Sequence, residues 1–342
     1  MSMGGDGGEP PPAGEGLDPD GEPLRVLVTG GAGFIGSHVV DGHLARGDRV
    51  WVVDDLSSGR RENVPDGVEL LEADIKSRTV RELMGDVRFH LVNHHAAQID
   101  VRVSVRDPIH DARVNVLGLL NLLEGAVETG VNRVIYVSSG GVVYGEPEEI
   151  PTPETAPKLP LSPYGVSKLA GEQYLHYYRT VQGLEYVALR YSNVYGPRQD
   201  PHGEAGVVAI FSHRLLSGEE LLIFGDGEQT RDYVYVKDVA HANLKAAELP
   251  LPAEGGIDSR AFNVATGVGT SVNRLADTLE SVANLRTGRV FRSPRAGELR
   301  HSTLDIERFT ARGWAPKWSL KDGLRETFQY IAATKTGTSL GT

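Results

Sequence analysis

The sequence predicts an α/β protein with a doubly wound parallel sheet and a smaller C-terminal α/β lobe. Short β-branched runs alternate with helix-like segments over residues 24–197, which specifies a parallel sheet covered on both faces. A glycine-rich turn joins the first of these runs to the first helix. After residue 197 the elements become shorter and loops more frequent. We therefore expect a larger domain over 24–197 and a lobe mainly over 198–335, with the return of some later segments to the larger domain left open.

Composition and charge argue against a nucleic-acid-binding protein, a disulfide-bonded protein and a membrane protein. The chain has 342 residues, a formal net charge of -11 and no cysteine. Phosphate-backbone binders present basic faces, so no nucleic-acid partner is expected, and without thiols there are no disulfides or thiolate metal sites. No apolar run reaches the roughly 18–20 residues that span a bilayer, and the N-terminus lacks the pattern of a signal peptide. We expect a cytoplasmic protein with no membrane partner, in which residues 1–23 form a disordered leader rich in Gly, Pro, Glu and Asp.

The first strand is predicted over Leu24–Thr29 and is followed by a glycine-rich turn. Gly30, Gly33 and Gly36 are spaced as G-x-x-G-x-x-G, and a helix-like segment begins at Ser37. Such glycines allow a tight turn, close approach of the backbone to a pyrophosphate, and close packing of helix on strand. The helix N-terminus adds amide donors and positive dipole charge for phosphates. The pattern predicts a dinucleotide site.

Acidic residues follow the next two strands. The second strand, Arg49–Val53, ends at Asp54 and Asp55, about 20 residues after the glycines, where an acid can bind an adenosine ribose diol. Its negative charge would repel a 2′-phosphate, so we expect NAD and not NADP. The third strand, Val68–Glu72, leads to Asp74, which could reach the adenine amino group.

The fourth strand, Phe89–His94, leads to a run of small residues that suits a cofactor passing over the strand end. His90, His94 and His95 fit the alternation of one strand poorly, and carboxylate partners are not evident. No metal site is therefore expected, and packing or polar contacts are the predicted roles of these histidines. An amphipathic helix follows over Asp111–Glu128.

Tyr164 and Lys168 carry the predicted chemistry. The fifth strand, Arg133–Val137, delivers Ser138 and Ser139 to the C-terminal edge of the sheet, where small-molecule sites of open α/β sheets lie. After a proline-rich loop a helix begins at Tyr164, and the four-residue spacing puts tyrosine and lysine on one face, one turn apart. A tyrosine hydroxyl titrates near ~10, and a nearby ammonium favours the tyrosinate. Tyr164 could then take a proton from an alcohol while a hydride leaves the same carbon.

The second half of the chain is predicted to form a smaller substrate-capping lobe. Its expected elements are three strands and two helices: Leu221–Phe224, Thr230–Val236, a helix from near Asp238, Ala261–Val264 and Val272–Asn284. Arg231 and Arg295 are either solvated surface arginines or ligands of an anionic group. The residues alone leave both readings open.

Eight motifs occur in order along the chain: V-T-G-G-A-G-F-I-G, D-D-L-S-S-G, A-D-I, H-A-A, V-S-S-G-G-V-V-Y-G, S-P-Y-G-V-S-K, L-R-Y-S-N-V-Y-G-P-R-Q and R-D-Y-V-Y-V-K-D-V. Together they resemble the extended short-chain dehydrogenase/reductases. Within these the chain looks most like the NAD-dependent nucleotide-sugar epimerases of the UDP-glucose (galactose) 4-epimerase type. The resemblance covers roughly residues 24–330 and implies a Rossmann-type larger domain, NAD as cofactor and a UDP-sugar as substrate. Relatives are commonly dimers, so a homodimer is expected.

The resemblance also implies residue roles. Tyr164 would be the acid/base at the sugar C4 hydroxyl, Lys168 would lower its pKa and bind the nicotinamide ribose, and Ser139 would complete the proton path. The implied cofactor-binding residues are Gly30, Gly33, Phe34, Ile35, Gly36, Asp54, Asp55, Leu56, Ser57, Ser58, Gly59, Asp74, Ile75, His95, Ala96, Ala97, Gln98, Asn115, Ser138, Tyr164, Lys168, Tyr191 and Val194. The implied substrate-binding residues are Ser139, Gly140, Tyr164, Asn193, Gly206, Val207, Val208, Phe224, Arg231, Arg295 and Glu298.

Some of these substrate residues carry a specific expectation from the resemblance. Asn193 would contact the substrate phosphates or sugar, and Phe224 would lie near the uracil. Arg231 and Arg295 would neutralise the diphosphate. Glu298 would take the uridine ribose.

The serine loop departs from part of the family. Several members carry the catalytic Ser or Thr four positions before the tyrosine of V-Y-G, and here that position is Gly140. A subgroup with an S-S-G-G loop has the hydroxyl one residue earlier, at Ser139, and Ser138 is the alternative. Sugar dehydratases and decarboxylating relatives carry an acid beside this loop, where the present chain has Gly140, Gly141 and Val142. C4 epimerisation through a transient 4-keto sugar is therefore the expected reaction.

The expected substrate pair is UDP-glucose and UDP-galactose. Epimerisation of UDP-N-acetylglucosamine is an alternative because Ser302 is small where a tyrosine restricts some relatives, and UDP-glucuronate is another because Ser139 and Ser192 could bind a carboxylate. A non-catalytic NAD-binding sensor on the same fold is less expected, since such proteins typically lose the tyrosine or the lysine. A dehydratase is less expected for the reason given above.

Overall fold

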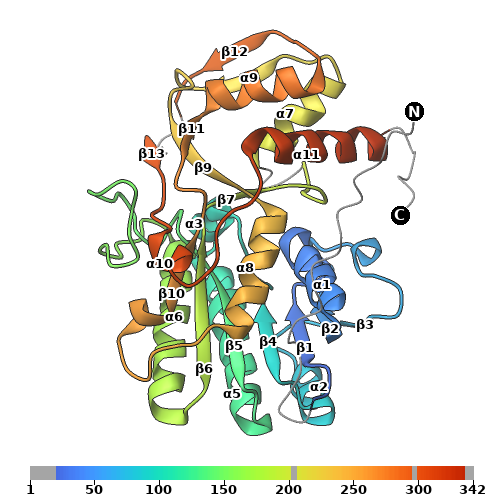
Figure 1. The fold of residues 1–342 in the computed structure, drawn as a ribbon, viewed down its shortest axis with the longest axis vertical. Helices are drawn as coiled ribbons and strands as arrows, with labels where there is room; N and C mark the ends of the chain where they lie inside the picture. The colour runs from blue at the N-terminus through green and yellow to red at the C-terminus, as the bar shows by residue number, and fades with distance from the viewer. Residues whose placement is uncertain (1–20, 202–205, 295–298, 336–342) are drawn as a thin grey trace, which may run out of the picture.

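The computed structural model describes residues 21–201, 206–294 and 299–335, and its centre is a seven-stranded parallel sheet (Figure 1). The strand order is β10-β6-β5-β4-β1-β2-β3. The strands are β1 (Arg25–Thr29), β2 (Arg49–Asp54), β3 (Glu69–Glu72), β4 (Leu91–His94), β5 (Arg133–Ser139), β6 (Glu185–Tyr191) and β10 (Ala261–Val264). The chain runs outward from β1 in one direction and from β4 in the other, so the topological switch point lies between these strands. The predicted doubly wound α/β fold is confirmed.

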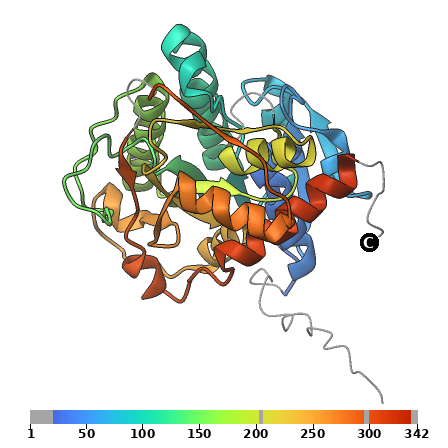
Figure 2. The same cartoon turned by 90° about the horizontal axis from the view of Figure 1, so that it is seen from above.

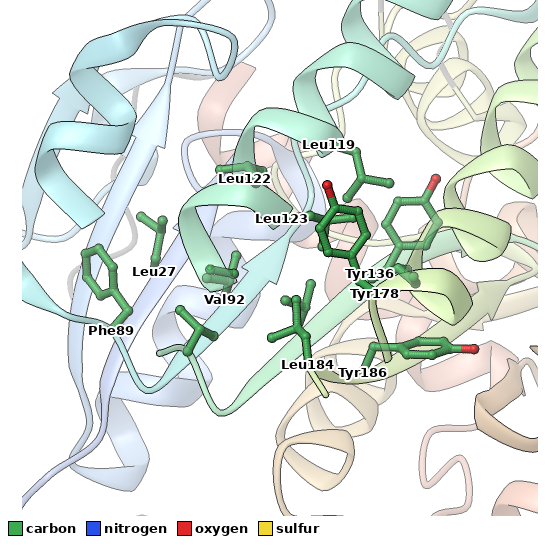
Figure 3. Close-up of a cluster of buried hydrophobic side chains, with 14 of the residues drawn as sticks. Leu27, Phe89, Val92, Leu119, Leu122, Leu123, Tyr136, Tyr178, Leu184 and Tyr186 are labelled. Carbon is green, nitrogen blue, oxygen red and sulfur yellow. The ribbon is translucent and has the colours of Figure 1, made fainter. Parts of the chain in front are cut away.

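Helices cover both faces of the sheet. On one face lie α2 (Arg78–Val87), α5 (Gly118–Thr129) and α6 (Pro163–Gln182), and on the other lie α1 (Phe34–Arg46) and α8 (Val236–Glu248). Alternate strand residues serve the two faces, as the pleat requires. Leu27 belongs to the buried cluster that includes Leu119 and Leu123 of α5 (Figure 3). Its neighbours Val26 and Val28 belong to the cluster on the opposite face.

The region between β4 and α5 differs from the expected single helix over Asp111–Glu128. It contains α3 (Val101–Arg106), α4 (Pro108–Ala112) and a π-helical stretch over Arg113–Leu117. Helix α4 begins early because Asp107 caps it, accepting a hydrogen bond from the His110 amide at 2.9 Å, and Pro108 occupies its first turn. π-Helical turns are rare and often found at functional sites. Here the turn contains Asn115.

The smaller lobe lies beyond the C-terminal edge of the sheet (Figures 1 and 2). Strand β9 (Thr230–Tyr235) pairs with β11 (Gly269–Ser271), β13 (His301–Ser302) and β7 (Asn193–Tyr195). Strand β8 (Leu221–Phe224) pairs with β12 (Arg289–Arg292). The remaining helices of this half are α7 (Val207–Leu216), α9 (Val272–Ala283), α10 (Glu307–Thr310), α11 (Leu320–Lys335) and a 3-10 turn at Ile257–Arg260. Another 3-10 turn, Arg61–Asn63, lies between β2 and β3.

Two later segments return to the sheet. Strand β10 pairs with β6 at the sheet edge, and α8 packs beside α1. The fifth strand is also longer than the predicted Arg133–Val137, because Ser138 and Ser139 continue the pairing with β6 opposite Arg190 and Tyr191. Both serines are therefore held by the sheet and not by a loose loop. No helix in the described part of the chain is long and apolar enough to cross a membrane.

A buried ion pair joins α6 to β6. Arg190 and Glu172 are both 0% exposed, and their side chains form hydrogen bonds of 2.5 and 3.0 Å. The Ser138 hydroxyl also donates to Glu172, at 2.6 Å. Removing one partner of a buried ion pair typically costs about 3–5 kcal/mol, because the other charge is left uncompensated. The pair thus fixes the ends of β5 and β6 against α6.

Candidate active site

The glycine-rich turn brings β1, α1 and the loop after β4 into close contact. Gly30 has φ +70°, and a Cβ on it would lie 2.5 Å from the Ala96 nitrogen. A Cβ on Gly36 would lie 2.1 Å from the Gly30 carbonyl oxygen. Helix α1 has Gly33 as its N-cap, with no side-chain capping bond. Its first-turn amides and positive dipole end are therefore available to an anionic ligand, which fits the pyrophosphate of a dinucleotide.

Asp54 anchors this turn at the end of β2. Its two carboxylate oxygens accept the Ala32 amide at 3.0 Å and the Leu56 amide at 2.9 Å. Burial raises the pKa of Asp54, although these hydrogen bonds act in the opposite direction. Gly59 is packed so closely that a Cβ on it would lie 2.7 Å from the carboxylate. Asp55 is instead exposed and accepts the Ser57 hydroxyl at 2.5 Å, so the two acids have different environments.

Asp74 and Ile75 lie at the end of β3. The Lys76 ammonium is 2.8 Å from the Asp74 carboxylate, and the Lys76 amide also donates to it. Partial burial raises the pKa of Asp74, but the interactions with Lys76 outweigh this effect and lower it. Ile75 is buried against Gly118, where a Cβ would come within 2.4 Å of the isoleucine side chain.

The three histidines around β4 have partners within the protein. His94 Nδ1 is 2.7 Å from the Thr29 hydroxyl, His95 Nε2 is 2.8 Å from the Asn93 side chain, and His90 Nε2 is 2.6 Å from the Arg25 guanidinium. Burial lowers the pKa of His94 well below its usual value and that of His95 to about 3, with a smaller contribution from the Lys168 charge. Both rings are neutral at pH 7. No group of three or more potential metal ligands occurs within residues 21–201, 206–294 and 299–335.

Asn115 shapes the loop that follows β4. Its side-chain amide donates to the Gln98 carbonyl and accepts the Gln98 amide hydrogen, both at 2.9 Å. Asn115 is only 2% exposed. The structure thus places it behind the predicted cofactor loop, where it holds the main chain at Gln98. The π-helical turn directs this side chain inward.

Tyr164 and Lys168 lie in the first turns of α6, as predicted. Ser162 caps the helix by accepting the Gly165 amide at 3.2 Å, and Pro163 begins it. Lys168 is 3% exposed, its ammonium donates to the Val137 carbonyl at 2.9 Å, and it lies 5.8 Å from the centre of the Tyr164 ring. Burial lowers the pKa of Lys168 to about 8, and the negative charge of Asp111 opposes this shift. Tyr164 is half-buried at the sheet edge.

The two serines at the end of β5 have different environments. Ser138 is 2% exposed and is bonded to Glu172, whereas Ser139 is partly exposed at the sheet edge. Gly140 is buried, and a Cβ on it would lie 2.4 Å from the Leu304 side chain. A Ser or Thr at position 140 would therefore collide with Leu304, which gives a packing reason for the glycine in this chain.

A cavity of about 480 Å³ opens between β7, α7, β8 and β9. Seven of its lining residues were predicted from the sequence: Asn193, Val194, Gly206, Val207, Val208, Phe224 and Arg231. The others were not predicted: Tyr195, Ile210, Phe211, Arg214, Leu222, Gln229, Tyr233 and Val272. Leu222 and Tyr233 lie two residues from the predicted Phe224 and Arg231 on the same strands. The alternation of side chains along a strand could have revealed both. Ser139, Gly140 and Tyr164 are not in this lining and lie at the sheet edge.

The predicted Arg295 and Glu298 lie outside the described residues. Tyr191 was expected at the cofactor, but its ring is buried in the sheet core and its hydroxyl accepts a hydrogen bond from the Asn243 side chain at 2.6 Å. Its side chain is therefore used in packing, because Tyr191 follows Arg190 on the opposite face of β6.

Comparisons with known proteins agree with this geometry. Residues 26–265 match the model of the NAD dependent epimerase/dehydratase family. The chain is 47% identical over 314 residues to a UDP-glucose 4-epimerase of Mycolicibacterium smegmatis, covering 90% of this chain and 98% of that protein. The structure of UDP-glucose 4-epimerase from Thermotoga maritima with UDP-glucose has a TM-score of 0.87 and 47% identity, covering 91% of this chain and 100% of that one. The Thermus thermophilus UDP-glucose 4-epimerase complex with NAD has a TM-score of 0.84 and 45% identity, covering 90% and 99%.

The contact between Gly36 and Gly30 leads to a prediction about NAD. Gly36→Ala places a methyl group 2.1 Å from the Gly30 carbonyl oxygen, so the turn must shift. The amides of the turn would then no longer point toward the phosphates. We expect NAD affinity to fall by at least about 100-fold, equivalent to roughly 2.7 kcal/mol, in a calorimetric titration of protein freed of nucleotide. The matched control is Gly85→Ala in α2, where a Cβ would have no atom within 4 Å. Unchanged NAD affinity in Gly36→Ala would contradict this assignment of the turn.

Proposed function

This chain belongs to the NAD dependent epimerase/dehydratase family, and on that premise we propose that it interconverts UDP-glucose and UDP-galactose by epimerisation at C4. One observation carries the proposal. A buried lysine lies beside a half-buried tyrosine at the sheet edge, on the helix next to the strand that ends in Ser139. NAD would be held by the glycine turn at the start of α1 and by the end of β2 at Asp54, and it would supply reversible hydride transfer at the sugar C4.

Lys168 makes Tyr164 a usable base. The ammonium is held at the sheet edge by the Val137 carbonyl, so its charge faces the tyrosine ring from a fixed position. A nearby positive charge favours the tyrosinate and lowers the pKa of the hydroxyl. Tyr164 then takes the proton of the C4 hydroxyl and returns it to the oxygen when the carbonyl is reduced. The same group works in both directions, so no second acid/base residue is required.

Ser139 is the hydroxyl that we place beside the substrate. The Ser138 hydroxyl is bonded to a glutamate that is itself paired with Arg190, whereas Ser139 is partly exposed at the edge. A hydroxyl in that position can donate to the C4 oxygen or carry its proton to Tyr164. Our proposal therefore gives this role to Ser139 and not to Ser138.

The cavity of the smaller lobe supports binding of the UDP group. Phe224 offers an aromatic face for the uracil, and Arg231 offers a positive charge for the diphosphate. Asn193 lines the same cavity and is the first residue of β7. Only Ser192 separates it from Tyr191, the last residue of the central strand β6. It can therefore contact the sugar or phosphates between the two parts of the molecule.

The loop after β5 favours epimerisation over elimination of water. Removing water from a sugar needs a further acid or base, and Gly140 and Gly141 provide no side chain. At position 140 none can be added without moving Leu304. UDP-N-acetylglucosamine remains an alternative substrate because Ser302 is small and pairs in β13 with Arg231 of the cavity. UDP-glucuronate remains another because Ser139 and Ser192 could bind its carboxylate.

We expect turnover to be fastest on UDP-glucose and UDP-galactose. The test follows the interconversion of each of the three UDP-sugar pairs by chromatography, with Tyr164→Phe as the comparison protein. The variant should lose at least about 1,000-fold in kcat, within the range of general acid–base catalysis and about 4 kcal/mol, while NAD affinity is kept. A higher rate on uronates or acetamido sugars would change the substrate, and near-normal turnover by Tyr164→Phe would refute the mechanism.

Ser139→Ala and Ser138→Ala should differ in kind. Ser139→Ala should lower kcat by about 10- to 100-fold with an unchanged melting temperature, because its hydroxyl is free to face the substrate. Ser138→Ala should act on stability, costing about 1–3 kcal/mol in urea denaturation, because a buried glutamate loses a donor. Both variants remove one hydroxyl from neighbouring residues of the same strand. A larger kcat loss in Ser138→Ala than in Ser139→Ala would reverse the assignment.

A homodimer is also part of the proposal. Helices α4 and α6 and the π-helical turn between them in sequence carry exposed apolar side chains that lie on neighbouring elements: Ile109, Leu117, Val166, Tyr174, Tyr177 and Val181. Large contiguous patches of exposed apolar side chains often mark protein–protein interfaces, whereas scattered single apolar residues do not. A second copy of this chain presenting the same helices would cover the face with a two-fold interface.

The dimer can be tested by charge insertion into this face. Val181→Glu should shift the sedimentation coefficient from that of a dimer to that of a monomer, because the interface would bury an unpaired carboxylate. Leu285→Glu, an exposed leucine after α9, is the control and should leave the assembly unchanged. A wild-type protein that sediments as a monomer at micromolar concentration would refute the dimer.

We place the protein in the cytoplasm. The support is a chain without cysteine, which is compatible with a reducing compartment, together with the absence of a membrane-spanning helix in the described residues. Fractionation of expressing cells tests the location, and recovery outside the cytoplasmic fraction would refute it.

A further inference from the structure

Asp111 is a buried carboxylate next to the proposed catalytic pair. It lies in α4 and is 0% exposed. One carboxylate oxygen accepts the Gln98 side-chain amide at 2.8 Å and the Asn115 side-chain amide at 3.0 Å. The other accepts the Ser167 hydroxyl at 2.5 Å. Asp111 therefore connects the loop after β4, the π-helical turn and α6.

The donors to Asp111 are all neutral. Gln98, Asn115 and Ser167 satisfy its oxygens by hydrogen bonding, but none of them cancels its charge. Buried carboxylates are stable when such bonds favour the charged form and a cation lies nearby. The cation here is Lys168, which directly follows Ser167 on α6, and the negative charge of Asp111 raises the pKa of that lysine against the larger effect of burial.

The other groups around Lys168 leave its charge unbalanced. From β5 come the Val137 carbonyl and the Tyr136 ring, and from α6 comes Tyr164. From β4 come His94 and His95, both neutral because burial lowers their pKa. Glu172, one turn further along α6, forms its hydrogen bonds with Arg190 and Ser138. Among the described residues, Asp111 is the acid whose charge acts on Lys168.

We propose that Asp111 is a positioning residue of this reaction: it orients Gln98 and Ser167, and its charge balances the buried Lys168 ammonium. The proposal rests on the function assigned above to Tyr164 and Lys168. Without the carboxylate charge the ammonium is less stable in its buried position, and the neutral amine beside a neutral phenol becomes the preferred form. That form lacks the tyrosinate that accepts the C4 proton.

Asp111→Asn separates the charge from the hydrogen bonds. An asparagine oxygen still accepts the two amides of Gln98 and Asn115, and its amino group can donate to Ser167. At low pH the lysine is protonated in both proteins, so their rates should be similar. As the pH rises toward and above about 8, where Lys168 titrates, the variant loses its ammonium first. The ratio of wild-type to variant kcat should therefore rise with pH, to on the order of tenfold for a one-unit change in the lysine pKa.

A merely structural role predicts a different profile. Local disorder would lower kcat by one factor at every pH. Asp238→Asn is the matched control, since Asp238 is 2% exposed and accepts the Lys317 and Trp318 amides far from α6, and its rate ratio should be independent of pH. Asp111→Glu restores the charge with an added methylene group and should restore the wild-type pH profile at a lower kcat.

A second measurement does not depend on activity. Proteins labelled with ¹³C at the lysine side chains can be titrated by nuclear magnetic resonance, and the Lys168 signal is the one missing from Lys168→Arg. We expect a midpoint near 8 in the wild type, a lower midpoint in Asp111→Asn and an unchanged one in Asp238→Asn. If Asp111→Asn does not fold, Asp111→Ser removes the same charge with a smaller polar side chain, and its midpoint should likewise lie below that of wild type; an unchanged midpoint would overturn the proposal.

The outcomes separate the two claims. A wild-type protein that epimerises no UDP-sugar refutes the proposed function, while the lysine titration still tests the effect of Asp111. An active wild type with a pH-independent rate ratio in Asp111→Asn and an unchanged Lys168 midpoint overturns the inference alone. In Asp111→Glu, a midpoint below that of wild type would also count against it.

Discussion

The ion pair between Arg190 and Glu172 is the interaction on which the geometry of the site depends. Both side chains are fully buried, so each charge relies on the other and on nearby polar groups. Arg190 also donates to the Tyr144 hydroxyl at 3.0 Å and to the Glu154 carbonyl at 2.9 Å. These bonds attach the long loop after β5 to the sheet. The strand that ends in Ser139, the helix that begins before Tyr164, and the loop between them thus share one buried cluster.

Close packing then limits the chemistry that the site can hold. Glycines stand where another backbone or a core side chain approaches, at Gly36 against Gly30 and at Gly140 against Leu304. The second contact joins the serine loop to a segment more than 160 residues later in the chain, which pairs with Thr152 just before it enters α10. A side chain at position 140 would therefore require Leu304 of that segment to move. Packing in the second half of the chain thus favours a glycine at this position of the first half.

The sequence predicted the features that depend on local order. The glycine turn, the acids after β2 and β3, and the Tyr164–Lys168 spacing all follow from neighbours in the chain, and the structure places them at one sheet edge. The features that escaped prediction depend on distant partners. The π-helical turn matters because Asn115 reaches Gln98, and Tyr191 is buried because Asn243 and the core receive it. The return of later segments to the large sheet was expected, but not that Ala261–Val264 would be the returning strand. Periodicity and spacing contain no information about such contacts.

The two buried acids beside α6 illustrate the same division in energetic terms. Glu172 is paired with Arg190, so its charge is balanced by the guanidinium and holds α6 against β6. Asp111 receives its hydrogen bonds from neutral side chains, so its charge still acts on Lys168. Both acids are fully buried, and neither stands out in the sequence. What distinguishes them is the partner that the fold supplies, a guanidinium for one and the ammonium beside Tyr164 for the other, and this difference assigns one acid to the architecture and the other to the proton chemistry.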